Sequence, residues 1–256
     1  MTIPLWTRPH HRATRADASV LLVAFSEAPL ADGVPFAMSR FGVPTEAAAS
    51  SLDTRTHARD DDPEWFDGWR TGAIASIAAS QLTDGGRLGS ARFCHSATAR
   101  VTDPPDHGHI QAAWAAARWF VERGCFAVLD AHAGRWHDGA RVAALAPDRP
   151  FDLGAEVTMV FETDRTPDFG HPIHTRGMAK FARPDLMAAA EPDTADMLAQ
   201  VLYHLAQALA DGETLSPGQG IDVDGRHEGS LMPYQPGVNA PEVHLNNEGY
   251  LLTLNR

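Results

Sequence analysis

The segment HPIHTRGMAKFARP, residues 171–184, gathers basic and imidazole side chains in a chain of formal net charge -12. Lys180 is the only lysine of the protein, and no acidic residue lies between His171 and Arg183. A turn or helix start here would add its backbone N–H groups to the positive field, and a glycine permits a positive φ angle or a close backbone approach. The segment therefore predicts a site for an anion or for an acidic partner surface. Its expected residues are His174, Arg176, Gly177, Lys180 and Arg183.

Two other interpretations of this segment stay open at the level of sequence. Met178 and Phe181 are three residues apart and would face the core from one turn of helix, with the basic side chains left in solvent. A lysine also has chemistry that an arginine lacks, because its pKa shifts on burial and it then acts as a base or forms a Schiff base. The segment is thus a binding surface, a core plug or the centre of a lysine-dependent enzyme.

Four histidines support a separate, metal-binding hypothesis. His107 and His109 lie just before an expected helix, whereas His95 lies on the strand region before it and His132 at the end of the strand after it. Neutral imidazoles suit zinc or copper, and a strand–helix–strand unit would let these side chains converge. However, no acidic or thiolate ligand stands at a recognisable metal spacing. We therefore expect no bound cofactor, and a metal- or lysine-dependent hydrolase is the alternative function.

Sequence signatures of known enzyme classes are missing from the chain. It contains no G-x-S-x-G elbow, no P-loop, no H-E-x-x-H pair and no EF-hand loop. Cys94 and His95 are adjacent, and neighbours on a strand point to opposite faces, which argues against a nucleophile–base pair. A basic segment on an acidic molecule without these signatures favours a non-enzymatic binding or regulatory protein.

Composition limits the classes of partner and the cellular compartment that we expect for this protein. The acidic balance repels nucleic-acid phosphates and anionic membrane surfaces. No apolar run approaches the roughly 18 residues that span a bilayer, and the start, MTIPLWTRPHHRATR, lacks the apolar core of a secretory signal. Two cysteines and the bias for arginine over lysine fit the reducing cytoplasm of a bacterium with a GC-rich genome. We expect a small anion or a protein as partner, neither nucleic acid nor membrane, and leave the oligomeric state undetermined.

Hydrophobic patterning predicts an α+β fold, with a mixed sheet and helices mainly on one face. Apolar or alternating runs predict strands at residues 18–25, 87–101, 125–132 and 154–163. Helical spacing predicts three helices, one starting at Asp62–Pro63, one at 110–123 and one at 193–211. The final stretch, EVHLNNEGYLLTL, predicts a hairpin that turns at 246–249.

A short internal match raises the question of duplication. Residues 38–44 read MSRFGVP and residues 178–184 read MAKFARP. We predict a loose tail at 1–16 and a single α+β domain at 17–256, which duplication would divide into halves 17–150 and 151–256. Duplication requires residues 18–85 and 154–223 to share a strand–loop–helix–strand order. The simpler interpretation is a turn, used twice, whose Met and Phe plug the core.

The stretch HTRGMAKFARPDL, residues 174–186, resembles the signature of an uncharacterised family of bacterial cytoplasmic proteins, H-T-x-G-[ML]-x-x-F-G-x-P-[DE]-L. The matching residues are His174, Thr175, Gly177, Met178, Phe181, Pro184, Asp185 and Leu186. Ala182 stands where the pattern favours glycine, from which we expect an unstrained backbone at this position. The resemblance covers the second half of the chain. It implies an α+β fold and brings no activity.

Overall fold

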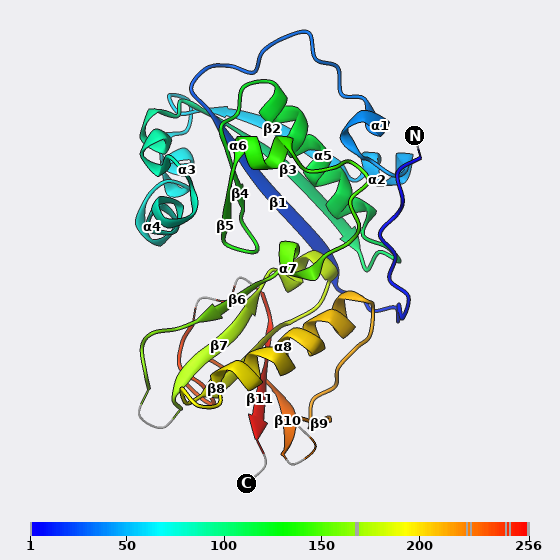
Figure 1. The fold of residues 1–256 in the computed structure, drawn as a ribbon, viewed down its shortest axis with the longest axis vertical. Helices are drawn as coiled ribbons and strands as arrows, with labels where there is room; N and C mark the ends of the chain where they lie inside the picture. The colour runs from blue at the N-terminus through cyan, green and yellow to red at the C-terminus, as the bar shows by residue number, and fades with distance from the viewer. Residues whose placement is uncertain are drawn as a thin grey trace. The chain divides into compact units, whose positions relative to one another are not determined.

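The computed structural model describes residues 2–166, 169–223, 225, 227–243, 245 and 247–254. The chain forms two compact units (Figure 1). Unit 1 comprises Met1–Thr7 and Ala18–Phe151, and unit 2 comprises Arg8–Asp17 and Asp152–Arg256. The last break, after Phe151, falls one residue from the boundary expected between the two halves.

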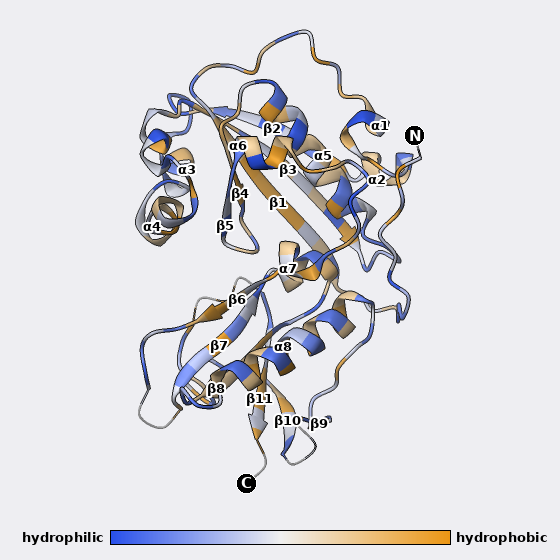
Figure 2. Cartoon of the chain, in the orientation of Figure 1, coloured by the Kyte–Doolittle hydropathy of each residue, from blue (hydrophilic) through white to orange (hydrophobic). Residues whose placement is uncertain are grey.

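Unit 1 is built on a five-stranded sheet with the order β2-β3-β1-β4-β5. The central strand β1 is buried on both faces, which explains its nearly continuous apolar sequence, visible in Figure 2. Leu22 and Ala24 point to one face and Val23 and Phe25 to the other. The strands are β1 (Asp17–Ser26), β2 (Leu52–Ala58), β3 (Phe93–Thr102), β4 (Ala127–Asp130) and β5 (Arg135–Asp138).

Helices cover both faces of this sheet. On one face α5 (Gly108–Glu122) packs on β3 and β2 through an alanine-rich surface that permits close approach. On the other face α3 (Pro63–Gly68) and α4 (Gly72–Gln81) cover Phe25, which contacts Phe66 edge to face with ring centroids 6.1 Å apart. The shorter elements are α1 (Met38–Phe41), α2 (Glu46–Ser50), α6 (Gly139–Ala143) and the 3-10 helix η1 (Gly85–Ser90).

The predicted helix start at Asp62 is confirmed in detail. The Asp62 carboxylate accepts a hydrogen bond from Trp65 N, and Pro63 occupies the first helical position. The expected continuous helix is instead two helices, because the chain breaks between α3 and α4 and Gly72 has a φ angle of +60°. Glycines inside a helix cost stability, so the tertiary contacts of each short helix decide where it ends.

Unit 2 is built on a six-stranded mixed sheet with the order β6-β7-β8-β11-β10-β9. Strands β8 and β11 are parallel, and the other neighbouring pairs are antiparallel. Helix α8 (Ala195–Ala210) packs on β7 and β8. The short helix α7 (Leu153–Glu156) precedes β6, and the 3-10 helix η2 (Met178–Phe181) connects β7 to β8. The strands are β6 (Thr158–Phe161), β7 (His171–Arg176), β8 (Asp185–Ala190), β9 (Gly220–Asp222), β10 (Glu228–Pro233) and β11 (Gly249–Leu254).

The α+β class and the mixed sheet are confirmed, whereas three finer expectations differ. Helices lie on one face of the six-stranded sheet, as expected, but on both faces of the five-stranded sheet. Residues 171–176, read as part of a turn or helix start, form β7. Strand β11 pairs with β10 and with β8, so it does not fold back in a hairpin on the stretch just before it; His244 and Asn246 lie outside the described residues.

The N-terminal residues do not form the loose tail that their polar composition suggested. In unit 1, Trp6 is buried, its Nε1 donates to the carbonyl of Arg149 at 2.9 Å, and its ring lies 5.5 Å from that of Phe151. In unit 2, the backbone N–H of His10 donates to Asp211 O at 2.9 Å. Single aromatic anchors and backbone hydrogen bonds hold the segment, and neither has a periodic signal in a sequence.

The matched heptapeptides adopt the same local turn. Each is one turn of helix with a buried phenylalanine, ended by a left-handed residue: Gly42 with φ 86° and Ala182 with φ 55°. Beyond the turn the connectivity differs, since the first leads through α2 into β2 and the second leads directly into β8. Duplication is therefore not supported, and the simpler interpretation, a turn used twice as a core plug, holds.

Candidate functional site

The basic segment expected to bind an anion is buried in unit 2. Lys180 has no exposed surface, and its Nζ donates to Glu156 Oε2 at 2.9 Å, where the carboxylate is equally buried. Glu156 comes from α7, 24 residues away in the chain, and so lies outside the segment between residues 171 and 183. The lysine is thus neutralised within the fold and does not face an external anion.

The guanidinium of Arg183 also donates its hydrogen bonds within the protein. Its Nε donates to Glu213 O at 2.9 Å, and its Nη2 donates to Gly212 O at 3.0 Å and to Arg12 O at 3.2 Å. These carbonyls belong to the end of α8 and to the N-terminal segment of unit 2, so one guanidinium links both to the η2 turn. A cation at a helix C-terminus is favourable in its own right.

Gly177 and His174 have structural roles in the same segment. Gly177 has a φ angle of 117°, and a Cβ there would lie 2.7 Å from Glu156 O, which confirms the expected positive φ angle and close backbone approach. His174 is 1% exposed, and its Nε2 lies 3.1 Å from Glu162 Oε1. Arg176, at the end of β7, is half-buried, and its Nε is buried without an acceptor among the described residues.

The remaining signature residues form a buried polar network between β7 and β8. Asp185 Oδ1 accepts from Thr175 Oγ1 at 3.0 Å and from Met178 N at 3.3 Å, and Thr175 Oγ1 in turn accepts from Leu186 N at 2.8 Å. Burial raises the pKa of Asp185 to about 7, against the opposing effect of its hydrogen bonds. Met178 and Phe181 are fully buried beside it. The motif therefore specifies a strand–turn–strand connection.

The backbone at Ala182 contradicts the expectation drawn from the sequence. Its φ of 55° and ψ of 41° place it in the left-handed region, where a Cβ is unfavourable by about 1–2 kcal/mol. We predict that Ala182→Gly raises the free energy of unfolding by up to about 1 kcal/mol, because relief of strain exceeds the entropy gained by the unfolded chain. Ala179→Gly, within η2, is the control and should lower it by about 0.5–1 kcal/mol. Equal losses in urea denaturation would contradict this assignment.

The four histidines do not converge. His95 lies between Ser26 Oγ, 3.1 Å from its Nε2, and Thr56 Oγ1, 2.9 Å from its Nδ1. Burial lowers the pKa of His95 to about 4, with Arg123 and His57 adding to the shift, so the ring is neutral at pH 7. As expected, Cys94 points to the opposite face, into the core around Phe25.

The other histidines occupy separate places in unit 1. His107 and His109 lie at the first turn of α5 with ring centroids 6.5 Å apart, and His107 packs on Phe151 at 4.9 Å. His132 follows β4. Within the part of the chain that the structure describes, no three His, Cys, Asp or Glu side chains are grouped to hold a metal ion. The metal-site alternative therefore has no structural support.

A buried arginine in unit 1 combines an Nε without an acceptor among the described residues with a place in the lining of a hollow. Arg118, on α5, is 8% exposed, and its Nη1 donates to Leu145 O at 3.1 Å. Its Nε has no acceptor among the described residues, and no carboxylate there pairs with it. Burial lowers the pKa of Arg118 to about 10, and the charge of Arg149 contributes, so the guanidinium still carries its charge at pH 7.

Arg118 lines a hollow of about 250 Å³ between α1, α5 and the segment that follows α6, which we call the Arg118 pocket. Arg40 and Glu122 form an ion pair at this pocket, so the one carboxylate among its lining residues is already matched by a cation. The other lining residues are Phe41, Val121, Ala143, Leu145 and Pro147. Arg118 is therefore the main group in this hollow that can form hydrogen bonds or an ion pair with a ligand.

The turn that follows α1 makes room for this guanidinium. A Cβ at Gly42 would lie 2.5 Å from Arg118 Nη2 and 2.5 Å from Pro147 O. Sequence reasoning missed Arg118, although a signal exists: it follows Trp114 by four residues and continues the stripe of Ile110 and Trp114 toward the core. An arginine in an apolar helical stripe is a more specific signal than a run of basic residues.

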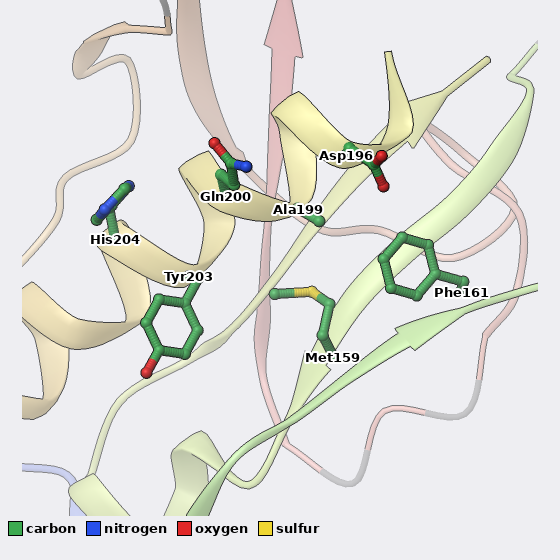
Figure 3. A pocket seen from close by; sticks show the side chains of 7 residues that line it. All are labelled: Met159, Phe161, Asp196, Ala199, Gln200, Tyr203 and His204. Atoms are coloured by element: carbon green, nitrogen blue, oxygen red, sulfur yellow. The ribbon is translucent and has the colours of Figure 1, made fainter. Parts of the chain in front are cut away.

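A second hollow lies in unit 2 between β6 and α8 and measures about 570 Å³ (Figure 3). Its lining residues are Met159, Phe161, Asp196, Ala199, Gln200, Tyr203 and His204. This groove has an apolar floor and no buried charge, which makes it suited to a protein surface and not to an anion.

Comparison with known proteins adds no assignment. No protein-family model, no curated protein and no solved structure matches the chain. Among the described residues, no helix is both long and apolar enough to cross a membrane. The geometry of the Arg118 pocket is therefore the basis for a functional proposal.

Proposed function

We propose that the chain is a non-enzymatic binding or regulatory protein of the bacterial cytoplasm that recognises a small organic anion in the Arg118 pocket. The observation that carries this proposal is a buried arginine, 8% exposed and charged at neutral pH, without a carboxylate partner among the described residues. The anionic ligand expected from the sequence is retained, and its site moves from residues 174–183 to Arg118. The bias for arginine over lysine, typical of a GC-rich genome, supports the bacterial assignment.

The energetic argument concerns the cost of burying a charge. A buried charge is costly unless it is paired or fully hydrogen-bonded, and proteins normally supply the partner themselves. Arg118 has one carbonyl acceptor, and its Nε–H lies without one. A carboxylate in the pocket would accept from the guanidinium of Arg118, whose planar fork of N–H donors favours bidentate geometry.

The shape and charge of the pocket favour a carboxylate with an apolar body. Phe41, Val121 and Leu145 provide apolar walls, and the volume of about 250 Å³ suits a small molecule. Glu122 stays nearby, held by Arg40, and its charge disfavours a dianion such as phosphate more than a monoanion. Benzoate and hexanoate therefore represent the proposed ligand class.

Calorimetric titration of the full chain tests the proposal with benzoate, hexanoate, benzamide and inorganic phosphate. Benzoate or hexanoate should bind saturably, and benzamide, which lacks the charge, should bind at least about tenfold more weakly. Arg118→Met should abolish carboxylate binding, whereas Arg118→Lys, which keeps the charge without the fork, should retain a fraction of it. The matched control is Arg141→Met, since Arg141 is an exposed arginine that lines a neighbouring hollow.

Circular dichroism of each variant separates loss of the site from loss of the fold. The proposal is contradicted if neither carboxylate binds the folded wild type, or if carboxylate affinity is the same in Arg118→Met as in the wild type. Tighter binding of phosphate than of benzoate would overturn the assigned ligand class.

A further inference from the structure

The groove between β6 and α8 leaves part of a sheet face uncovered. Helix α8 packs on β7 and β8, whereas β6, the edge strand, directs Met159 and Phe161 toward the groove (Figure 3). Phe161 is 51% exposed and Tyr203, across the groove on α8, is 40% exposed. Most of β6 has the hydrophobic colour in Figure 2. Exposed aromatic side chains around an apolar hollow are typical of an interaction surface.

The polar residues on the outer side of α8 have a self-complementary order. Asp196, Gln200 and His204 are spaced by four residues, so they form one row along the helix, and all three are exposed. Among the described residues, no side-chain hydrogen bond or ion pair is formed by these three residues. Along the helix the row offers a carboxylate, an amide and an imidazole, and in the reverse direction the order is imidazole, amide and carboxylate.

We propose that this groove binds a second copy of the chain, in a two-fold symmetric homodimer with the two α8 helices antiparallel. A two-fold axis beside Gln200 places Asp196 opposite His204 of the second copy at both ends of the row, because each lies four residues from Gln200. The same arrangement therefore forms two carboxylate–imidazole contacts, one at each end of the row, and pairs the two Gln200 amides at the centre. This charge and hydrogen-bond complementarity is the reason to choose a second copy over an unrelated partner.

The apolar residues fit the same arrangement. Ala199 is small and half-buried, which lets two helix backbones approach closely at the groove. Phe161 and Tyr203 from each copy then lose their exposed surface between the helices, which supplies the favourable hydrophobic term. The interface lies wholly on unit 2, so this inference does not depend on the Arg118 pocket of unit 1 and stands or falls separately.

Sedimentation equilibrium at physiological ionic strength tests the inference by exchanging the two ends of the row. The wild type should be a dimer, and Asp196→His or His204→Asp alone should weaken association by at least about tenfold, because like groups then face each other. The double variant, Asp196→His with His204→Asp, should restore association, since the exchanged row is again self-complementary. Restoration cannot arise from a purely structural role of either residue.

A test variant and a matched control variant probe the hydrophobic part of the interface. Phe161→Asp should dissociate the dimer, whereas Met232→Asp, at a residue 43% exposed on β10, should not. Circular dichroism checks that each variant is folded. A wild type that stays monomeric at all concentrations, or a dimer that none of the α8 and β6 substitutions weakens, would overturn the proposal.

Discussion

Replacing Lys180 alone with methionine is expected to lower the free energy of unfolding of unit 2 by about 3–5 kcal/mol. Lys180 and Glu156 are both fully buried and 2.9 Å apart, so the substitution leaves a carboxylate in the core without its cation. The double variant Lys180→Met with Glu156→Leu should recover most of this loss, because apolar groups of similar volume replace a buried pair at little cost. Urea denaturation followed by circular dichroism measures both values.

An exposed ion pair in the same unit provides the control. Arg165 Nη2 lies 2.8 Å from Glu191 Oε1, with side chains 49% and 52% exposed, and Arg165→Met should cost no more than about 1 kcal/mol. If Lys180→Met costs as little as Arg165→Met, Lys180 is reached by water, and residues 174–183 return as a surface site.

The second large effect is a change in how stability depends on pH. The pKa of Asp185 is raised to about 7 in the folded chain, and an unfolded aspartic acid titrates near 4. The fold therefore holds a proton that the unfolded chain releases between these values. The resulting stabilisation is complete below about pH 4 and is lost as the pH rises through about 7, with a total of about 4 kcal/mol.

Asp185→Asn isolates this contribution. Asparagine keeps an oxygen that accepts from Thr175 and from Met178 N, and it cannot ionise. The variant should match the wild type near pH 4 and exceed it in stability at pH 8, when both are measured by urea denaturation across this range. Parallel profiles for the two proteins would show that Asp185 ionises as freely in the fold as in the unfolded chain.

Local signals in the sequence predicted the central elements of the fold. The apolar run of β1, the helical spacing of α5 and α8, and the Asp62–Pro63 start are set by nearest neighbours, and each matches the structure. Gly177 was likewise readable, because few residues other than glycine tolerate its φ of 117°. Pairings between distant segments, such as β11 with β8, have no such signal, and the predicted hairpin failed for that reason.

At the candidate site, the charged residues could be identified from the sequence, but their partners in distant segments could not. Residues 174–183 look basic in sequence, yet Glu156 neutralises Lys180 and the carbonyls of residues 12, 212 and 213 satisfy Arg183. Arg118 stands among alanines and looks structural, and only the fold shows that no carboxylate among the described residues reaches it. The partner of a charge, and not the charge itself, decides whether it is available to a ligand.

The central claim is that the guanidinium of Arg118 binds a carboxylate, and nuclear magnetic resonance observes the Nε–H of this guanidinium directly. In a ¹⁵N-labelled chain the arginine Nε–H signals are resolved from the backbone, and the spectrum of Arg118→Lys identifies the Arg118 signal by its loss. Titration with benzoate should move this signal downfield and saturably, while the Arg141 Nε–H signal stays in place. An Arg118 signal that does not move at saturating benzoate would contradict the proposed function.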